Sequence, residues 1–252
     1  MVNIFKRIIR KSTKEVRHQV ERILNLDPVI DNDERFRRIR ARCKPYTMTS
    51  KAKMYALYKA VEYVIHAKIL GDFVECGVWR GGSMMLIAHT LRELNVTNRK
   101  IFLYDTFEGM AKPTEEDRQL SNKNAPVLAK WKEEAEQDHN NWCYASLSDV
   151  KANMALTGYP ENNLVFVKGK IEDTVPRTMP SRIALLRLDT DWYESTNHEL
   201  RHLFPRLSKK GVLILDDYGH WAGSKKAVDD YFFRKPILLN RIDPGGRIGL
   251  KD

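Results

Sequence analysis

Four aspartates follow two short apolar runs near the C-terminal end of the sequence, at positions where strands of a sheet would end. They are Asp189 and Asp191 after the first run (183–186), and Asp216 and Asp217 after the second (212–215). Short apolar runs are typical of strands buried on both faces of a parallel sheet. Residues 195–207 between them have the pattern of a helix, so the two strands are expected to be parallel neighbours. The carboxylates should then lie together at the edge of the sheet where ligands bind.

A cluster of this kind predicts a bound cation. Like charges at neighbouring strand ends repel each other unless a cation or a proton lies between them. A hard divalent ion meets this requirement most simply, and oxygen ligands favour magnesium, manganese or calcium. In the alternative interpretation, one pair of acids caps the following helix and the others are solvated. The pattern occurs at two strand ends rather than one, which favours the metal site.

The composition excludes some classes of protein. The 252 residues suffice for one large α/β domain with appended segments. No apolar run approaches the roughly 20 residues that a membrane span needs, and the first residues lack the apolar core of a signal peptide. Cys43, Cys76 and Cys143 are widely spaced and form no metal-ligand pattern. We therefore expect a reduced, cytoplasmic protein.

The first 45 residues carry most of the positive charge. They contain 13 Lys and Arg against six Asp and Glu, an excess of seven out of a net charge of +10. Apolar residues recur every three or four positions between Val2 and Leu24, which predicts a basic amphipathic helix. Its role is open between packing on the domain or on a second subunit in a dimer, contact with a membrane surface or polyanion, and nucleic-acid binding. No nucleic-acid partner is expected, because the segment lacks an interleaved set of aromatic residues for base stacking.

Residues 46–252 alternate between strand and helix patterns, which predicts a doubly wound, mostly parallel α/β sheet. Two final strands flank a turn at 243–246 and should form a hairpin. The stretch 110–142 is polar and irregular, with a helical patch at 129–137, and has the character of a lid inserted at the ligand edge. Strands are expected at 72–76, 100–104, 164–167, 183–188, 212–215, 237–241 and 247–250, and helices at 52–67, 83–94, 147–156, 195–207 and 225–233.

Three features at successive strand ends indicate a nucleoside cofactor. A loop with Glu75, Gly77 and Ser83 joins the first strand to a helix; its glycines let a ligand approach the backbone, and the helix N-terminus offers free N–H groups. The loop is looser than G-x-G-x-x-G, so it suits a carboxylate-bearing ligand at least as well as a pyrophosphate. Asp105 ends the second strand, where an acid commonly binds ribose hydroxyls. Residues 169–173 follow the third strand and are placed to border an adenine.

These motifs together resemble those of a known family. Residues 72–83 (DFVECGVWRGGS) and 104–110 (YDTFEGM) look like S-adenosylmethionine-binding motifs, and residues 188–196 (LDTDWYEST) and 211–218 (GVLILDDY) complete the pattern. The chain resembles the macrocin/mycinamicin sugar O-methyltransferases, a metal-dependent family that methylates hydroxyls of glycosylated natural products. The resemblance covers about residues 45–235. It implies a Rossmann-like class I methyltransferase fold with a seven-stranded sheet and an antiparallel last strand, which fits the expected C-terminal hairpin.

The resemblance also implies roles for the clustered acids. Asp189, Asp216 and Asp217 would be the ligands of Mg²⁺ or Mn²⁺, and Asp191 would be a candidate general base. Thr190 departs from the family pattern, which has glycine between the two acids of this motif. That departure leaves the metal ligands in place. It makes the geometry on the side where the substrate binds an open question.

Further roles concern the cofactor, S-adenosyl-L-methionine. Its methionine part would lie along Glu75, Gly77 and Ser83, and Thr49 would reach the carboxylate of that part. Asp105 would bind the ribose, and Phe107 would lie near the adenine.

We therefore expect a metal-dependent O-methyltransferase that acts on a sugar or glycosylated small molecule, whose adjacent hydroxyls would chelate the metal. A catechol-like phenol is an alternative acceptor, because the same chemistry would serve it. A non-catalytic binding protein on this scaffold is a third interpretation, disfavoured because the acids, the glycine loop and Asp105 occur together. His220 is a second candidate base or substrate contact, unless it is structural. Three aromatic residues are candidates for stacking on a sugar, unless they pack in the core: Trp192, Tyr193 and Trp221.

Overall fold

The computed structural model describes residues 27–252, and the chain divides into two compact units, 1–38 and 39–252. In the first unit, helix α2 (Pro28–Asp31) follows Asp27, whose side chain accepts hydrogen bonds from two backbone N–H groups of the first turn. Helix α3 (Glu34–Cys43) begins in this unit and ends in the second. The amphipathic helix predicted between Val2 and Leu24, with its expected roles in a dimer or at a membrane, lies outside the described residues.

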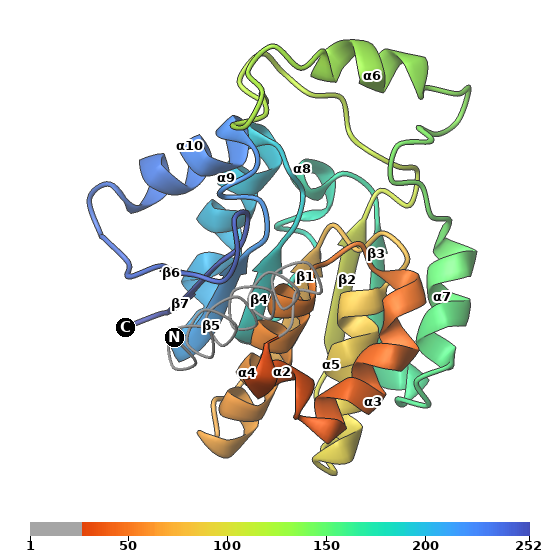
Figure 1. Ribbon diagram of the computed structural model, residues 1–252, viewed down its shortest axis with the longest axis vertical. Coiled ribbons are helices and arrows are strands. Elements are labelled where there is room, and N and C mark those ends of the chain that lie inside the picture. The colour runs from red at the N-terminus through yellow and green to blue at the C-terminus, as the bar shows by residue number, and fades with distance from the viewer. Residues whose placement is uncertain (1–26) are drawn as a thin grey trace, which may run out of the picture. The chain divides into compact units, whose positions relative to one another are not determined.

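A seven-stranded sheet organises residues 39–252 (Figure 1). Its strands lie in the order β3-β2-β1-β4-β5-β7-β6. The first five strands pair in parallel, and β7 pairs antiparallel with both β5 and β6. This arrangement confirms the predicted doubly wound sheet with its antiparallel C-terminal hairpin. The strands are β1 (Asp72–Cys76), β2 (Ile101–Asp105), β3 (Leu164–Lys168), β4 (Ile183–Leu188), β5 (Leu207–Leu215), β6 (Asn240–Arg241) and β7 (Arg247–Leu250).

The helices pack in two groups, one on each face of the sheet (Figure 1). In one group α5 contacts α4 and α7, and in the other α9 contacts α8 and α10. Between residues 27 and 252, no helix has both the length and the apolarity to cross a membrane. Apart from the end of α3 and the insertion at 110–142, the helices of residues 39–252 are α4 (Lys51–His66), α5 (Gly82–Glu93), α7 (Leu147–Ala155), α8 (Ile171–Thr174), α9 (Tyr193–His202) and α10 (Ala222–Phe232), with short 3₁₀ turns at Lys44–Tyr46, Glu161–Asn163 and Phe204–Arg206.

Some elements differ from their predicted bounds because tertiary pairing and packing override the local pattern. Strand β5 begins earlier than predicted, since Leu207 already pairs with Ile183 of β4. Strand β6 keeps only two of the five residues predicted, because Ile237 and Leu239 pack against the core instead of pairing. Helix α8 was not predicted, since four residues are too few to show a helical period.

The insertion at 110–142 contains one helix, α6 (Val127–Glu133), between long loops (Figure 1). Its first part is hydrogen-bonded to the loops that follow β4 and β5. The indole N–H of Trp192 donates to the carbonyl of Ala111 at 2.8 Å, and the N–H of Leu120 donates to the carbonyl of His220 at 2.9 Å. These bonds fasten the insertion to the same edge of the sheet that carries the clustered aspartates.

Candidate active site

The carboxyl ends of β4 and β5 bring three aspartates together. One carboxylate oxygen from each of Asp189, Asp216 and Asp217 lies within 4.8 Å of the other two. Asp189 follows β4 and the other two follow β5, and the register of these parallel strands places Leu188 beside Leu215. The spacing and the all-oxygen donor set fit a divalent cation such as Mg²⁺ or Mn²⁺.

A buried arginine binds two of these acids. Arg187 in β4 is 1% exposed, and its guanidinium donates hydrogen bonds to Glu75 of β1, to Asp189 at 2.6 Å and to Asp216. Another N–H of the same group lies 3.3 Å from Oγ1 of Thr49. A guanidinium is planar and permanently charged, so it can bind several carboxylates in a fixed arrangement. Arg187 therefore sets the relative positions of side chains from three strand ends.

A second cation reaches the cluster from α4. Nζ of Lys53 donates to Oδ2 of Asp216 at 2.5 Å and to the carbonyl of Asp216 at 3.0 Å. Burial alone would raise the pKa of Asp216, but the charges of Arg187 and Lys53 together lower it. Asp216 is therefore held in its charged form.

The other two acids are less well neutralised. Burial raises the pKa of Asp189 well above its usual value; Arg187 opposes this rise and the neighbouring carboxylates add to it. Burial, followed by the charges of Asp191 and Asp216, raises the pKa of Asp217 in the same way. A divalent cation among these groups would favour their charged forms.

Asp191 lies at the border of the cluster. Its φ of +66° falls in the left-handed region, which is uncommon for a residue other than glycine. Its N–H donates to Oδ2 of Asp217 at 3.3 Å. Burial, and then the charge of Asp189, raise the pKa of Asp191 to about 7. A carboxyl group with such a pKa can accept a proton at neutral pH.

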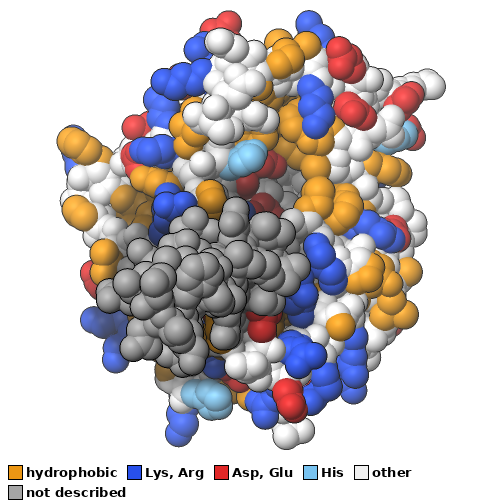
Figure 2. Space-filling model, in the orientation of Figure 1, with side chains coloured by type: hydrophobic (Ala, Val, Ile, Leu, Met, Phe, Trp, Pro, Cys, Tyr) orange, Lys and Arg blue, Asp and Glu red, His pale blue; other side chains and the backbone are white. Residues whose placement is uncertain are grey.

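Two cavities, of about 300 and 350 Å³, border the same strand ends. Both are lined by Gly77, Asp105, Asp189 and Asp191. Gly77 has a φ of +81°, and a Cβ at this position would lie 2.0 Å from the carbonyl oxygen of Asp189. Only glycine therefore lets the loops after β1 and β4 come this close. In Figure 2, acidic side chains lie at the floor of a hollow in the surface.

The smaller cavity joins the candidate metal ligands to residues expected along the methionine part of the cofactor. Thr49, Gly77 and Ser83 line it together with Asp216 and Asp217. The structure thus places the candidate metal ligands and three of the four residues predicted along the methionine part around one space of about 300 Å³.

Two residues that were expected at the cofactor line neither cavity. Glu75 is 1% exposed, and its carboxylate binds Arg187. Its second oxygen, Oε2, has no hydrogen-bond partner within the described part of the chain. Phe107 is 2% exposed and lies in the turn that follows β2. Both side chains support the walls of the site from within the core.

Asp105 closes β2 and holds the loop that follows β1. Its Oδ2 accepts hydrogen bonds from the N–H groups of Val78 and Trp79, at 2.6 and 3.1 Å, and its Oδ1 accepts one from Phe107 at 2.8 Å. Burial raises the pKa of Asp105, and these backbone donors oppose the rise. The carboxylate borders both cavities, at the strand end where an acid binds ribose in nucleoside-binding sheets.

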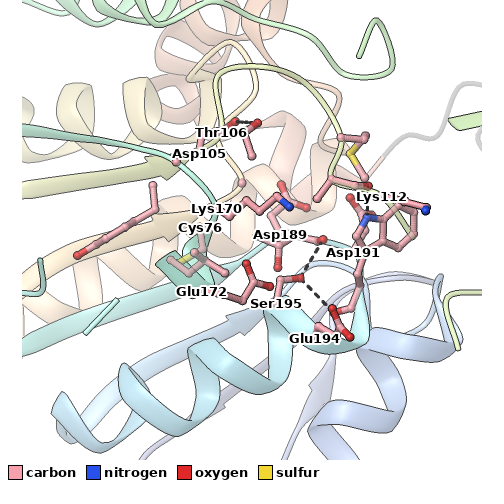
Figure 3. Close-up of a pocket in the computed structure, with 18 of the residues that line it drawn as sticks. Cys76, Asp105, Thr106, Lys112, Lys170, Glu172, Asp189, Asp191, Glu194 and Ser195 are labelled. Carbon is pink, nitrogen blue, oxygen red and sulfur yellow. Dashed lines mark hydrogen bonds between the residues drawn. The ribbon is translucent and has the colours of Figure 1, made fainter. Parts of the chain in front are cut away.

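The larger cavity extends from Asp105 to the loop after β3 (Figure 3). Residues 169–173, predicted to border an adenine, form one wall, and residues of the insertion form another. Thr190 lines this cavity only, whereas Asp216 and Asp217 line only the smaller one. Thr190, which stands where the family pattern has glycine, therefore borders a different cavity from two of the three candidate metal ligands, Asp216 and Asp217.

Three tryptophans pack together beside the cavities. The ring centroids of Trp192 and Trp221 are 5.0 Å apart, and Trp142 of the insertion lies 5.9 Å from Trp192. Trp192 and Trp221 are only 3% and 4% exposed, which agrees with the core-packing interpretation rather than with open stacking surfaces. Trp142, Trp221 and His220 nevertheless line the smaller cavity, together with Thr49 and Lys53.

Sequence reasoning missed the two cations of this site. Arg187 did leave a signal, since a charged residue in an otherwise apolar, fully buried strand must be paired. Lys53 left none, because a lysine in the first turns of a helix is usually solvated.

Comparisons with known proteins bear on this geometry. Residues 5–244 match the model of the macrocin-O-methyltransferase (TylF) family. The 8-demethyl-8-(2,3-dimethoxy-alpha-L-rhamnosyl)-tetracenomycin-C 4'-O-methyltransferase of Streptomyces olivaceus is 35% identical over 80% of this chain and 74% of its own. The mycinamicin III 3''-O-methyltransferase of Micromonospora griseorubida is 31% identical over 76% of this chain and 72% of its own. The solved structure of the O-methyltransferase NovP has a TM-score of 0.71 and 30% identity, and the match covers 82% of each chain. This chain therefore belongs to the macrocin O-methyltransferase family and has a class I methyltransferase fold.

Proposed function

We propose that this chain transfers the methyl group of S-adenosyl-L-methionine to a hydroxyl of a sugar or glycosylated small molecule, with Mg²⁺ or Mn²⁺ as a cofactor. The observation that carries the proposal is the convergence of Asp189, Asp216 and Asp217 beside Gly77 at the carboxyl edge of the sheet. The relative from Streptomyces olivaceus is named for a rhamnosyl compound, which supports a sugar hydroxyl as the acceptor.

The three aspartates would hold the metal. When bound, Mg²⁺ lowers the pKa of a hydroxyl that it coordinates and can orient two adjacent hydroxyls at once. The chain's own contribution is to arrange the ligands in advance: Arg187 holds Asp189 and Asp216, and Lys53 holds the second oxygen of Asp216. Ligands fixed in this way need little rearrangement when the cation binds.

The two cavities suit the two halves of the cofactor. The smaller cavity offers the hydroxyls of Thr49 and Ser83 to the polar end of the methionine part. Asp105 at the junction would accept hydrogen bonds from ribose hydroxyls, and the larger cavity beyond it has room for the adenine. Glu75 and Phe107 would support the walls of these cavities from within the core. Glu75 would do so through its ion pair with Arg187.

Asp191 is the proposed general base. S-adenosyl-L-methionine, when bound, would supply the methyl group to an acceptor oxygen in line with its carbon–sulfur bond and would leave as S-adenosylhomocysteine. The proton of the acceptor hydroxyl passes to the carboxylate of Asp191, whose pKa of about 7 suits this transfer. His220 lines the same cavity and is the second candidate for the role.

Methyl transfer from labelled S-adenosyl-L-methionine to panels of glycosides, sugar nucleotides and phenols tests the proposal, with the methylated position read by NMR. We expect a methylated sugar hydroxyl, loss of turnover after exhaustive metal removal, and recovery with Mg²⁺. Asp217→Asn should abolish turnover, whereas Asp229→Asn, which changes an exposed acid of α10, should not. Methylation of phenols alone would assign a catechol-like acceptor, and full turnover without metal would refute the metal role.

A further inference from the structure

Glu199 is a buried acid that the proposed chemistry does not use. It lies on α9, behind the turn that carries Asp189 and Asp191, and its exposure is 0%. Its Oε1 accepts a hydrogen bond from Oγ1 of Thr190 at 3.0 Å. Its Oε2 has no hydrogen-bond partner in the described part of the chain.

The placement of Glu199 is unfavourable for stability alone. A buried carboxyl oxygen without a strong hydrogen-bond donor loses its hydration, and the thiol of Cys76 nearby is only a weak donor. Burial raises the pKa of Glu199 well above its usual value, and the hydrogen bond from Thr190 and the nearby thiol of Cys76 only partly oppose the rise. An apolar side chain of similar size would avoid this penalty, so the group is expected to serve something other than the core.

The neighbours of Glu199 connect it to two strand ends of the site. Thr190 lies in the turn after β4, between two of the clustered acids. Cys76 ends β1, and burial together with the nearby Glu199 carboxyl raises the pKa of its thiol. The side chain of Glu199 thus lies under the point where the loops after β1 and β4 meet.

Helix α9 and its N-cap residue, Trp192, hold Thr190 at more than one point. The carbonyl of Thr190 accepts hydrogen bonds from the N–H of Trp192 at 2.7 Å and from the hydroxyl of Ser195 at 3.3 Å. Figure 3 shows Ser195 next to the turn that carries Asp189 and Asp191. The bond to Glu199 is the third link, and it is the one that fixes the Thr190 side chain.

The turn needs such support because its backbone is strained. Asp191 has a φ of +66°, a conformation that costs free energy in a residue other than glycine and persists only where the surroundings impose it. On its other side the turn lies against Gly77, whose missing Cβ leaves room for the carbonyl of Asp189. The turn is therefore enclosed between the loop after β1 and the start of α9.

We propose that Glu199 is a positioning residue, which acts through Thr190 to aim Asp189 and Asp191 into the site. The proposal rests on the proposed function, since Asp189 is the metal ligand and Asp191 the base that it would orient. Without the bond between Glu199 and Thr190, the turn would rotate more freely, and Asp189 would spend less time in the geometry that the cation requires. Loss of a residue that orients a ligand typically lowers metal affinity by about 10-fold or more.

The test is a titration of the full chain with Mn²⁺, in which EPR measures the concentration of the free ion. No acceptor is added, so the measurement does not depend on turnover. Glu199→Leu and Thr190→Val each remove one partner of the bond while keeping a side chain of similar size. We expect each to weaken Mn²⁺ binding by about 10-fold, and the double variant to bind no more weakly than either single one. Glu199→Gln keeps the acceptor oxygen and Thr190→Ser keeps the hydroxyl, so each of these variants should retain the wild-type affinity for Mn²⁺.

Thermal unfolding separates this role from a structural one. Glu199→Leu removes a buried oxygen without a partner, so its melting temperature should equal or exceed that of the wild type while Mn²⁺ binding falls. Folded Glu199→Leu and Thr190→Val variants with wild-type Mn²⁺ affinity would overturn the positioning role and leave the proposed function intact. Failure of the wild type itself to bind Mn²⁺ would instead overturn the metal site, and the positioning role with it.

Discussion

Nη1 of Arg187, near the end of β4, donates a hydrogen bond over 2.6 Å to Oδ2 of Asp189, the residue that follows this strand. Residues two positions apart in a strand point to the same face, which brings this pair together. The same guanidinium binds Glu75 and Asp216 from the strands on either side. Because Arg187 is 1% exposed, water does little to screen these interactions. The protein thus supplies part of the positive charge that its clustered acids require.

Removal of the Arg187 charge should destabilise the fold. Arg187→Met leaves Glu75, Asp189 and Asp216 without their shared partner, and the loss of one member of a buried ion pair costs about 3–5 kcal/mol. Urea unfolding measures the change in the free energy of unfolding. Lys59→Met, which breaks an ion pair with Glu62 by changing a half-exposed lysine, is the control and should cost at most about 1 kcal/mol. Equal stability of Arg187→Met and the wild type would contradict this assignment.

Asp117 of the insertion should stabilise the start of α9. Its Oδ1 accepts the N–H of Tyr193 at 2.8 Å, and its Oδ2 accepts two hydrogen bonds from Thr114. Asp117→Ala removes this helix cap, and we expect a loss of about 1–2 kcal/mol in the free energy of unfolding. Glu116→Ala, an exposed acid one residue away, should change it little.

Gly223 provides an independent check on the same contact. A Cβ at Gly223 would lie 1.9 Å from Oδ1 of Asp117, so Gly223→Ala should displace that carboxylate. We expect the double variant Asp117→Ala with Gly223→Ala to lose less stability than the sum of the two single variants, because both disturb one interaction. Strictly additive losses in chemical unfolding would mean that the two residues act separately.

The cysteines should react slowly in the folded protein. Burial raises the pKa of Cys43 and of Cys143 to about 12, and it raises that of Cys76 as well. A thiol with a pKa of about 12 is ionised to about one part in 10⁴ at pH 8, and the thiolate is the reactive form. A disulfide reagent such as DTNB should therefore label the native chain slowly at pH 8 and all three cysteines rapidly in denaturant. Fast labelling of the native chain would show an accessible thiolate.

The arrangement of the sheet could be predicted because its signals are local. Strand β4 is buried along its whole length, so its sequence is an apolar run, and the acids after β4 and β5 mark where these parallel strands end. The glycine at Gly77 was also informative, since only a residue without Cβ fits against the carbonyl of Asp189. In such cases, the constraint on a residue comes from its own conformation or its own burial.

Other parts of the site depend on partners that are distant in sequence. Arg187 binds Glu75, which is 112 residues away, and Lys53 binds Asp216, which is 163 residues away. Phe107 could not be placed from its motif alone, because whether a ring faces a cavity or the core depends on the packing of the whole turn. The insertion gave a periodic signal only in its helical patch, where α6 forms, and its bonds to the loops after β4 and β5 follow from tertiary contacts.

We propose that Asp189, Asp216 and Asp217 hold one divalent cation beside the methyl donor. Anomalous diffraction from crystals of the chain grown with Mn²⁺ and S-adenosylhomocysteine tests it most directly. We expect a single strong manganese peak at ligand distance from one oxygen of each aspartate, with the sulfur of S-adenosylhomocysteine close to it in the smaller cavity. Density for S-adenosylhomocysteine in the site without a manganese peak between the three carboxylates would refute this metal site.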